Sequence, residues 1–157
     1  MTRVLVTGSS GFIGSAVCEA LAERGIDVVG YDLKPSRFTS APWTKQMRFI
    51  SGDMRDLAAL GAVLADCEVT HIIHAAALTP DEQRERNHPD LIVEVNLLGS
   101  ARLAMAVAKV RPQSRILHLS SIAFMARPSP VKTGDSTKTA ASRNQSRCMV
   151  SLNSPRK

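Results

Sequence analysis

Aromatic residues are scarce in this sequence. Four Phe, one Trp and one Tyr make up 4% of the 157 residues. Proteins that bind single-stranded nucleic acid stack successive bases on clustered aromatic side chains. The aromatic residues here are too scattered along the sequence to form such a platform, so we expect no nucleic-acid partner.

Cysteine is also rare, and its pattern predicts neither disulfides nor a metal site. Cys18, Cys67 and Cys148 are odd in number and widely spaced, which fits simple packing in a reducing compartment. No pair among the four histidines has the spacing of helical metal ligands. We therefore expect that the protein binds no metal.

Long apolar runs are lacking as well. No run approaches the roughly 20 residues that a membrane helix needs. The polar Thr2 and Arg3 lead straight into a short apolar strand instead of a signal peptide. We expect a cytoplasmic protein with no membrane partner.

The formal net charge of +6 is concentrated at the C-terminal end. Up to Val131 the sequence holds 14 basic and 13 acidic residues, whereas 132–157 holds six basic residues and one acid, Asp135. This end is rich in Ser, Thr, Lys and Arg and has no sustained periodicity, which predicts a disordered basic tail at 132–157. The length and the apolar content of 44% indicate one domain, at 1–131.

Strand-like and helix-like segments alternate before the tail. Short apolar runs, typical of buried parallel strands, occur at 3–7, 27–31, 47–50, 69–76 and 115–120. Helical stretches occur at 11–25, 56–65 and 89–110, the last with an apolar stripe of Leu91, Val95, Leu98, Leu103 and Val107. This order predicts an α/β fold, a doubly wound parallel sheet of the Rossmann type with about five strands, truncated before a sixth.

Three glycines lie between the first predicted strand and the first predicted helix. Gly8 permits a tight turn, Gly11 lets backbone approach a pyrophosphate, and Gly14 lets helix and strand pack closely. Phe12 and Ile13 would contribute backbone N–H groups at the helix N-terminus, where anions bind. The alternative is a glycine-rich turn without a ligand.

Asp32 follows the second predicted strand, about 20 residues beyond the glycines. A carboxylate there accepts hydrogen bonds from the adenosine ribose hydroxyls and repels a 2′-phosphate, which favours NAD over NADP. Lys34 and Arg37 would partly offset that repulsion. The alternative for Asp32 is a solvated turn carboxylate.

With these residues placed, the chain resembles the extended short-chain dehydrogenase/reductase family, in its NAD-dependent epimerase/dehydratase branch, which acts on nucleotide sugars. The resemblance covers about Met1 to Pro130. Its motifs arrive in family order at Thr7–Gly14, Asp32, Gly52–Asp56, His74–Ala77, Val95–Gly99 and Leu119–Ser121.

The resemblance implies roles for residues beyond the glycine turn. Asp53 is expected to contact the adenine ring, with Met54 beside it in the cofactor site. The small residues Ala75, Ala76 and Ala77 would let the cofactor lie against the end of a strand.

Two further residues take roles from the same resemblance. Asn96 would link the long helix to the strands of the cofactor site, and Ser121, or its neighbour Ser120, would hydrogen-bond the reacting sugar hydroxyl. The alternatives are a helix-packing Asn96 and a capping or turn serine at Ser121.

The family reaction also needs a Tyr and a Lys four residues later, and this pair is missing. The single tyrosine, Tyr31, belongs to the second predicted strand, and the Tyr-Gly that usually follows the serine loop appears as Met125-Ala126. The leading prediction is therefore the NAD-binding part of a nucleotide-sugar epimerase/dehydratase that is inactive alone. The family also implies a homodimer formed through the long helix.

One hypothesis explains the missing pair by a shifted reading frame in the tail. Codons for Cys148 to Lys157 can be chosen so that the shifted frame encodes Tyr-Gly-Leu-Ser-Lys. The Gly follows from the Met149 and Val150 codons, whereas the Tyr and the Lys each depend on a synonymous choice. The change in charge and periodicity near Lys132 supports the hypothesis.

Two other functions fit parts of the sequence. One is a non-catalytic dinucleotide-sensing or regulatory protein, in which the Tyr is truly missing and the tail contacts a partner. The other is a nucleic-acid-binding protein with a basic arm, which only the tail supports.

Overall fold

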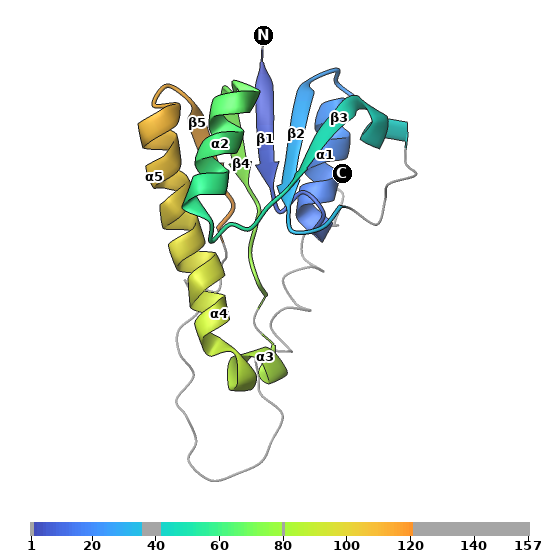
Figure 1. The fold of residues 1–157 in the computed structure, drawn as a ribbon. Coiled ribbons are helices and arrows are strands. Elements are labelled where there is room, and N and C mark those ends of the chain that lie inside the picture. The colour runs from blue at the N-terminus through green and yellow to red at the C-terminus, as the bar shows by residue number, and fades with distance from the viewer. Residues whose placement is uncertain (1, 36–41, 80, 121–157) are drawn as a thin grey trace, which may run out of the picture. The chain divides into compact units, whose positions relative to one another are not determined.

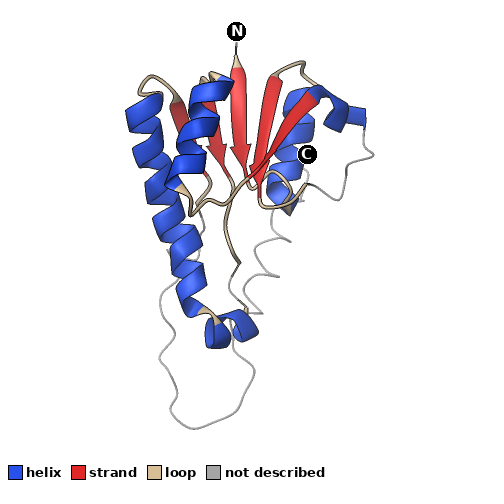
Figure 2. Ribbon diagram, in the orientation of Figure 1, coloured by secondary structure: helices blue, strands red, loops and turns tan. Residues whose placement is uncertain are grey.

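A parallel sheet organises the part of the chain that the structure describes. The computed structural model describes residues 2–35, 42–79 and 81–120. Its five strands lie in the order β3-β2-β1-β4-β5 (Figures 1 and 2), which confirms the predicted doubly wound α/β sheet. Ser121 and the tail predicted at 132–157 lie outside the described residues.

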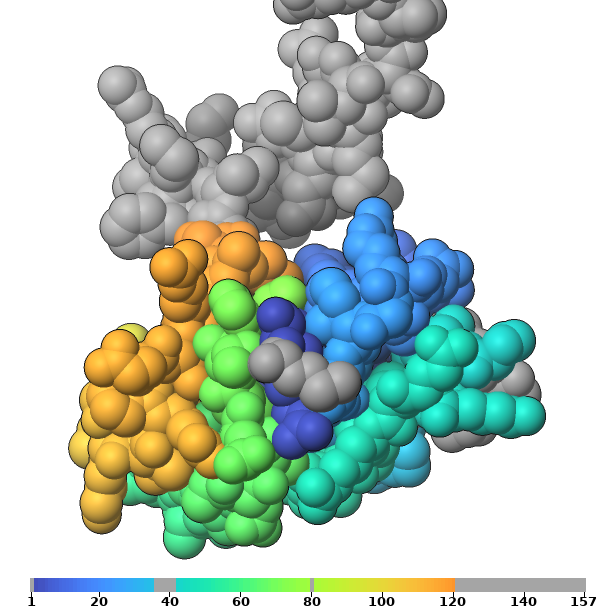
Figure 3. Space-filling model, turned by 90° about the horizontal axis from the view of Figure 1, so that it is seen from above, coloured from blue at the N-terminus to red at the C-terminus, as the bar shows by residue number. Residues whose placement is uncertain are grey.

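The strands agree closely with the predicted segments. They are β1 (Arg3–Thr7), β2 (Asp27–Asp32), β3 (Met47–Ser51), β4 (His71–His74) and β5 (Arg115–His118). Seen from above, the colours run from orange near β5 to teal near β3 (Figure 3). β4 and β5 are shorter than predicted, so Ala75 and Ala76 belong to the loop after β4.

Helices alternate with the strands along the chain. They are α1 (Phe12–Ala22), η1 (Pro42–Gln46), α2 (Leu57–Cys67), α3 (Glu82–Asn87), α4 (Pro89–Val93), η2 (Glu94–Gly99) and α5 (Ser100–Val110). The last three form one continuous helix, as predicted for 89–110, but η2 is a wider π-helical turn. The sequence pattern predicts neither the 3-10 helix η1 nor α3.

The two faces of the sheet carry separate apolar cores. Side chains alternate between the faces along each strand. One core joins the sheet to α2 and α5 and includes Leu5, Val29, Ile72, Leu64 and Leu103. The other joins the sheet to α1 and η1 and includes Val4, Val6, Val28, Cys18 and Trp43. This double cover explains why the central strands are apolar at nearly every position.

Gly25 lies in the turn that closes α1, at the end of the helical stretch predicted for 11–25. Its φ of +68° is a left-handed conformation that favours glycine. The N–H of Gly25 donates to the carbonyl oxygen of Ala22 at 2.9 Å, and the N–H of Ile26 donates to that of Leu21 at 3.1 Å. These bonds satisfy carbonyl groups that the end of a helix would leave free.

The long helix Pro89–Val110 departs from one sequence expectation. Its most apolar 18-residue window has a mean hydropathy of 1.6, so by length and composition alone it could cross a membrane. The expectation that no apolar run approaches this length is therefore wrong. A core helix of a soluble protein passes the same test, and Leu103, Ala106 and Val107 are buried in the core shared with α2. Packing against the rest of the fold thus accounts for part of this apolar character.

The hydroxyl of Ser9 is a buried polar group. Its side chain is 3% exposed, and its Oγ finds no hydrogen-bond partner among the described residues. An unsatisfied buried hydroxyl destabilises the folded state. We expect Ser9→Ala to raise the free energy of unfolding by about 1 kcal/mol, measured by urea unfolding.

A matched control for Ser9→Ala is Ser114→Ala. The Ser114 Oγ donates to the carbonyl oxygen of Val69 at 2.6 Å, so its removal leaves a partner unsatisfied and should lower stability by about 1 kcal/mol. A stability loss in both variants would contradict the account of Ser9.

Candidate functional site

The strand order reverses between β1 and β4, and a cavity lies beyond the carboxyl ends of these strands. In open α/β sheets, ligands bind at such a switch point. The cavity has a volume of about 540 Å³, within the usual range for small-molecule sites. Its lining comes from the loops after β1, β2, β3 and β4, and from Leu91 and Val95 on the long helix.

The glycine turn after β1 depends on very close backbone contact. Gly8 has a φ of +70°, and a Cβ there would lie 2.6 Å from backbone atoms of Ala76. A Cβ on Gly14 would overlap the carbonyl group of Gly8. Both positions therefore require glycine, as the sequence predicts for a phosphate cradle.

The amino end of α1 offers backbone donors beside this turn. Gly11 is the N-cap residue and makes no side-chain capping bond, while its own N–H donates to the carbonyl oxygen of Gly8 at 3.0 Å. The first N–H groups of the helix, at Phe12 and Ile13, thus lack a side-chain cap. Gly8 and Gly11 line the cavity, whereas Phe12 and Ile13 do not, and the side chains of these two residues are exposed.

Asp32 lies at the carboxyl end of β2 and lines the cavity. Its carboxylate accepts from the backbone N–H groups of Ser10 at 2.9 Å and Leu33 at 2.7 Å. The first bond ties the carboxylate to the glycine turn. Each carboxylate oxygen has two acceptor sites, so both oxygens keep one for a ligand.

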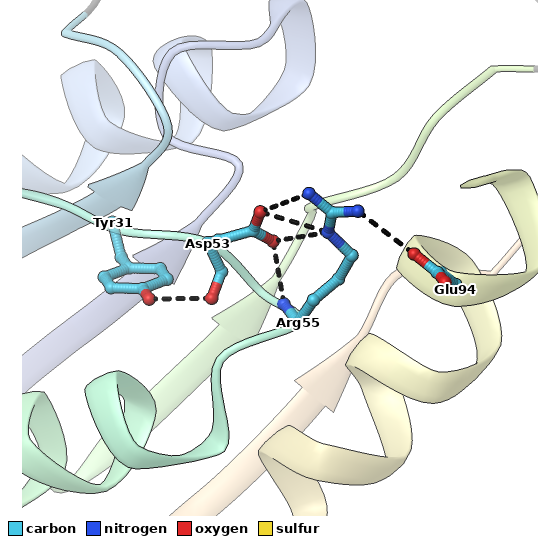
Figure 4. Close-up of polar contacts among 4 residues, drawn as sticks. All are labelled: Tyr31, Asp53, Arg55 and Glu94. Carbon is cyan, nitrogen blue, oxygen red and sulfur yellow. Dashed lines mark hydrogen bonds and ion pairs between the residues drawn. The ribbon is translucent and has the colours of Figure 1, made fainter.

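Asp53 and Met54 line the cavity next to Asp32, and Asp53 has a partner that the sequence did not indicate. The Arg55 guanidinium binds its carboxylate, with Nη2 to Oδ2 at 2.8 Å, and also binds Glu94 on η2 at 3.0 Å (Figure 4). The hydrogen bonds from Arg55 lower the pKa of Asp53. Arg55 therefore fixes the orientation of this carboxylate and links the loop after β3 to the long helix.

Tyr31, the only tyrosine, also anchors the loop after β3. Its ring is fully buried, and its hydroxyl donates to the carbonyl oxygen of Asp53 at 3.0 Å (Figure 4). Burial, with the nearby charges of Asp56 and Asp53, raises the pKa of Tyr31 to about 12. Tyr31 is therefore a neutral hydrogen-bond donor and is unsuited to act as a base.

The small residues after β4 form another wall of the cavity. Ala75, Ala76 and Ala77 all line it. The N–H of Ala75 donates to the carbonyl oxygen of Thr7 at 3.1 Å, which holds the loop against the end of β1. Larger side chains here would fill space that the cavity now keeps open.

Asn96 acts on the cavity through its neighbour Leu78. Its Oδ1 accepts from the N–H of Leu78 at 2.7 Å, and its Nδ2 donates to the carbonyl oxygen of Leu78 at 2.9 Å. Asn96 does not line the cavity, whereas Leu78 does. Asn96 thus links the long helix to the loop after β4, and its role toward a cofactor stays a prediction.

A buried histidine joins the same region and carries no role in the sequence prediction. His74, at the end of β4, contacts Thr7 on β1 and Ser100 on α5. Burial, followed by the nearby His118, lowers the pKa of His74 to about 4. Within the part of the chain that the structure describes, no group of three or more His, Cys, Asp or Glu side chains could hold a metal ion.

The chain is similar to known proteins in both sequence and structure. The sequence matches the NAD dependent epimerase/dehydratase family over residues 4–151. The chain belongs to this family. The match confirms the resemblance drawn from the motifs and extends beyond Pro130, where that resemblance was expected to end.

Individual members of the family show the same likeness. The chain is 36% identical to a UDP-glucose 4-epimerase of Mycolicibacterium smegmatis over 123 residues, which is 76% of this chain and 38% of that protein. It matches the structure of a UDP-glucose 4-epimerase complex with NAD from Thermus thermophilus, with 35% identity, a TM-score of 0.60, and coverage of 69% and 34%. It also matches MoeE5 in complex with UDP-glucose and NAD, with 31% identity, a TM-score of 0.63, and coverage of 76% and 36%. The chain thus spans little more than a third of the length of these family members.

The glycine turn makes a direct prediction. Gly14→Ala should lower the free energy of unfolding by about 2 kcal/mol, because the added methyl overlaps the Gly8 carbonyl group and the backbone must shift. The control is Gly61→Ala in α2, where nothing lies within 4 Å of the new Cβ. This change should raise stability by about 0.5 kcal/mol. Equal stability of both variants in urea unfolding would contradict the packing described here.

His74 predicts a pH dependence of stability. The unfolded chain takes up a proton at this residue near pH 6.5, whereas the folded protein does so only near pH 4. The stabilisation is therefore complete above pH 6.5 and is lost as the pH falls from 6.5 to 4, by up to about 3 kcal/mol. Urea unfolding across this range should show the loss in the wild type and a smaller loss in His74→Asn. If the stability of both proteins fell by the same amount over this pH range, the lowered pKa of His74 would be contradicted.

Proposed function

We propose that the chain binds NAD in the cavity at the switch point and forms the cofactor-binding part of a nucleotide-sugar epimerase/dehydratase. The observation that carries the proposal is the combination of the glycine turn with the Asp32 carboxylate, 2.9 Å from the Ser10 amide of that turn. This pairing brings a donor site for phosphate and an acceptor site for a ribose into one cavity.

The residues of the cavity fit such a cofactor at several points. At Gly8 and Gly14 a Cβ would overlap the protein's own backbone. The tight turn that these glycines permit brings Gly8, Ser10 and Gly11 to the cavity lining, beside the amino end of α1. Asp32 would accept from the adenosine ribose hydroxyls, and the loop that holds Asp53 would lie along the adenine. When bound, NAD supplies a hydride acceptor, and this chain's own described residues bind and orient it.

The family relatives support the choice of cofactor and substrate class. The Thermus thermophilus epimerase is described in complex with NAD, and MoeE5 with UDP-glucose and NAD. We therefore propose NAD as the cofactor of this chain and a nucleotide sugar as its substrate class. Ser121, expected from the sequence to contact the sugar hydroxyl, lies outside the described residues and stays a prediction, as does the cytoplasmic location.

We propose further that the chain forms a homodimer through the long helix. Val93, Leu97 and Met105 are large apolar residues of this helix. Their side chains are 51%, 64% and 61% exposed. Exposed apolar side chains on one helix of this kind are typical of a protein–protein interface.

Cofactor choice tests the role of Asp32. We expect the wild type to bind NAD more tightly than NADP in isothermal titration, because the carboxylate repels a 2′-phosphate. Asp32→Asn should weaken NAD binding about 10-fold or more, since it replaces hydrogen bonds to a charged group, and should reduce the preference for NAD. Asp66→Asn, at an exposed position of α2, is the matched control and should bind as the wild type. Unchanged NAD affinity in Asp32→Asn would overturn the assignment.

Turnover provides a separate test. The only tyrosine is buried with a pKa raised to about 12, and Pro35 stands four residues after it, so the chain has no Tyr-x-x-x-Lys pair. We expect no epimerisation of UDP-glucose in the presence of NAD, above the level of a preparation from cells without the gene. Turnover by the purified chain would show that another group acts as the base. NAD binding without turnover is also the behaviour expected of the alternative, a dinucleotide-sensing protein.

The coding DNA separates the remaining alternatives. If the shifted-frame hypothesis is correct, the frame that overlaps codons 148–157 encodes Tyr-Gly-x-Ser-Lys and continues as a long open frame. If that frame closes at once, the tail is native, and the search for a function turns to sensing and partner binding.

A further inference from the structure

The carboxyl edge of the sheet contains a chain of hydrogen bonds with His74 at its centre. The His74 side chain is 2% exposed. Its Nδ1 lies 2.6 Å from the Oγ1 of Thr7, and its Nε2 lies 2.9 Å from the Oγ of Ser100. The Ser100 Oγ lies 2.7 Å from the carbonyl oxygen of Asn96. One imidazole thus joins β1 to the long helix.

The donors in this chain can be assigned from the last bond. A carbonyl oxygen can only accept, so the single hydroxyl proton of Ser100 is donated to Asn96. Ser100 must then accept from His74, which places the imidazole proton on Nε2. The free lone pair on Nδ1 accepts from the hydroxyl of Thr7. Every group in the chain is satisfied by a neutral imidazole with its proton on Nε2.

The same hydrogen bonds continue into the wall of the cavity. The Thr7 Oγ1 accepts a long bond from the N–H of Ala76 at 3.4 Å. At the other end, the Asn96 side chain holds both backbone groups of Leu78. The segment from Ala76 to Leu78 is therefore attached at one end to Thr7 and at the other to Asn96, and His74 lies between these two anchors.

This segment is the one that the glycine turn contacts most closely. A Cβ on Gly8 would lie 2.6 Å from the Ala76 backbone, so a small shift of Ala76 changes the space available at the turn. His74 itself does not line the cavity. Its effect on a ligand must therefore pass through the loop that it supports.

We propose that His74 is a positioning residue, whose neutral imidazole couples the end of β1 to the long helix and thereby holds the segment Ala76–Leu78 in the conformation that accepts the dinucleotide. The proposal rests on the NAD binding proposed above. It assigns a function to the histidine that precedes the alanine motif, a residue with no chemical role in the predicted site.

The groups around His74 keep it uncharged. β1 presents the neutral hydroxyl of Thr7, and α5 presents that of Ser100. From β5, the ring of His118 lies 4.8 Å away, centroid to centroid, and its charge would oppose a charge on His74. A second proton on the imidazole would face Thr7, whose hydroxyl would have to turn away from its present role as donor.

The first test needs no cofactor. Nitrogen NMR of the imidazole in the full-length apo chain should show His74 with its proton on Nε2 and a bare Nδ1 from pH 8 to pH 6. A proton on Nδ1, or a charged ring at pH 6, overturns the proposal. In Ser100→Ala, the backbone amide signals of Ala76 and Leu78 should shift, whereas His71→Asn should leave them in place.

His71→Asn is the matched control because His71 lies on the same strand at its opposite end, where its Nδ1 contacts Thr70 at 2.9 Å. His74→Asn keeps an acceptor for Thr7 but cannot reach Ser100. We expect His74→Asn and Ser100→Ala each to weaken NAD binding roughly 10-fold. The double variant should be no weaker than either single variant, because both remove the same bond. Full NAD affinity in both single variants overturns the proposal.

Failure of the proposed function gives a different result. If the wild type binds no NAD while the tautomer and the amide shifts are as expected, the cofactor assignment fails and the coupling by His74 is upheld. A well-dispersed amide spectrum of each variant establishes that it folds. If His74→Asn does not fold, Ser100→Ala decides the outcome, since it keeps the imidazole and removes the partner of its Nε2.

Discussion

The site depends on the close approach of two backbone segments, the turn after β1 and the loop after β4. The left-handed Gly8 lies where any side chain would meet the backbone of Ala76, and Gly14 lies where a side chain would meet Gly8 itself. The amino end of α1 can face the cavity only because both contacts are free of side chains. The position of Asp32, bonded to Ser10 of the same turn, follows from this geometry.

Much of this arrangement could be predicted from the sequence. Short apolar runs located all five strands, and the three glycines located the turn, because a tight turn and a close helix contact admit few residue types. Asp32 could be placed because it ends a strand next to the first one, and the carboxyl ends of parallel strands meet at one edge. Local sequence rules were sufficient wherever a backbone conformation or a close contact admits only a few residue types.

The remaining contacts join residues far apart in sequence, and local patterns do not reveal them. Arg55 reaches Glu94, and His74 reaches Ser100, only after β3, β4 and the long helix have packed together. Helical periodicity also predicts Leu98 on a buried stripe, yet it is 42% exposed. The wider π-helical turn of η2 changes the phase of the helix at that point and directs Asn96 toward Leu78.

The most direct test of the account is a crystal structure of the chain grown with NAD. The account predicts the pyrophosphate at the N–H groups of Phe12 and Ile13, and the adenosine ribose hydroxyls within hydrogen-bond distance of the Asp32 carboxylate. NAD bound elsewhere, or with its ribose away from Asp32, would contradict the central claim that the glycine turn and Asp32 form one dinucleotide site.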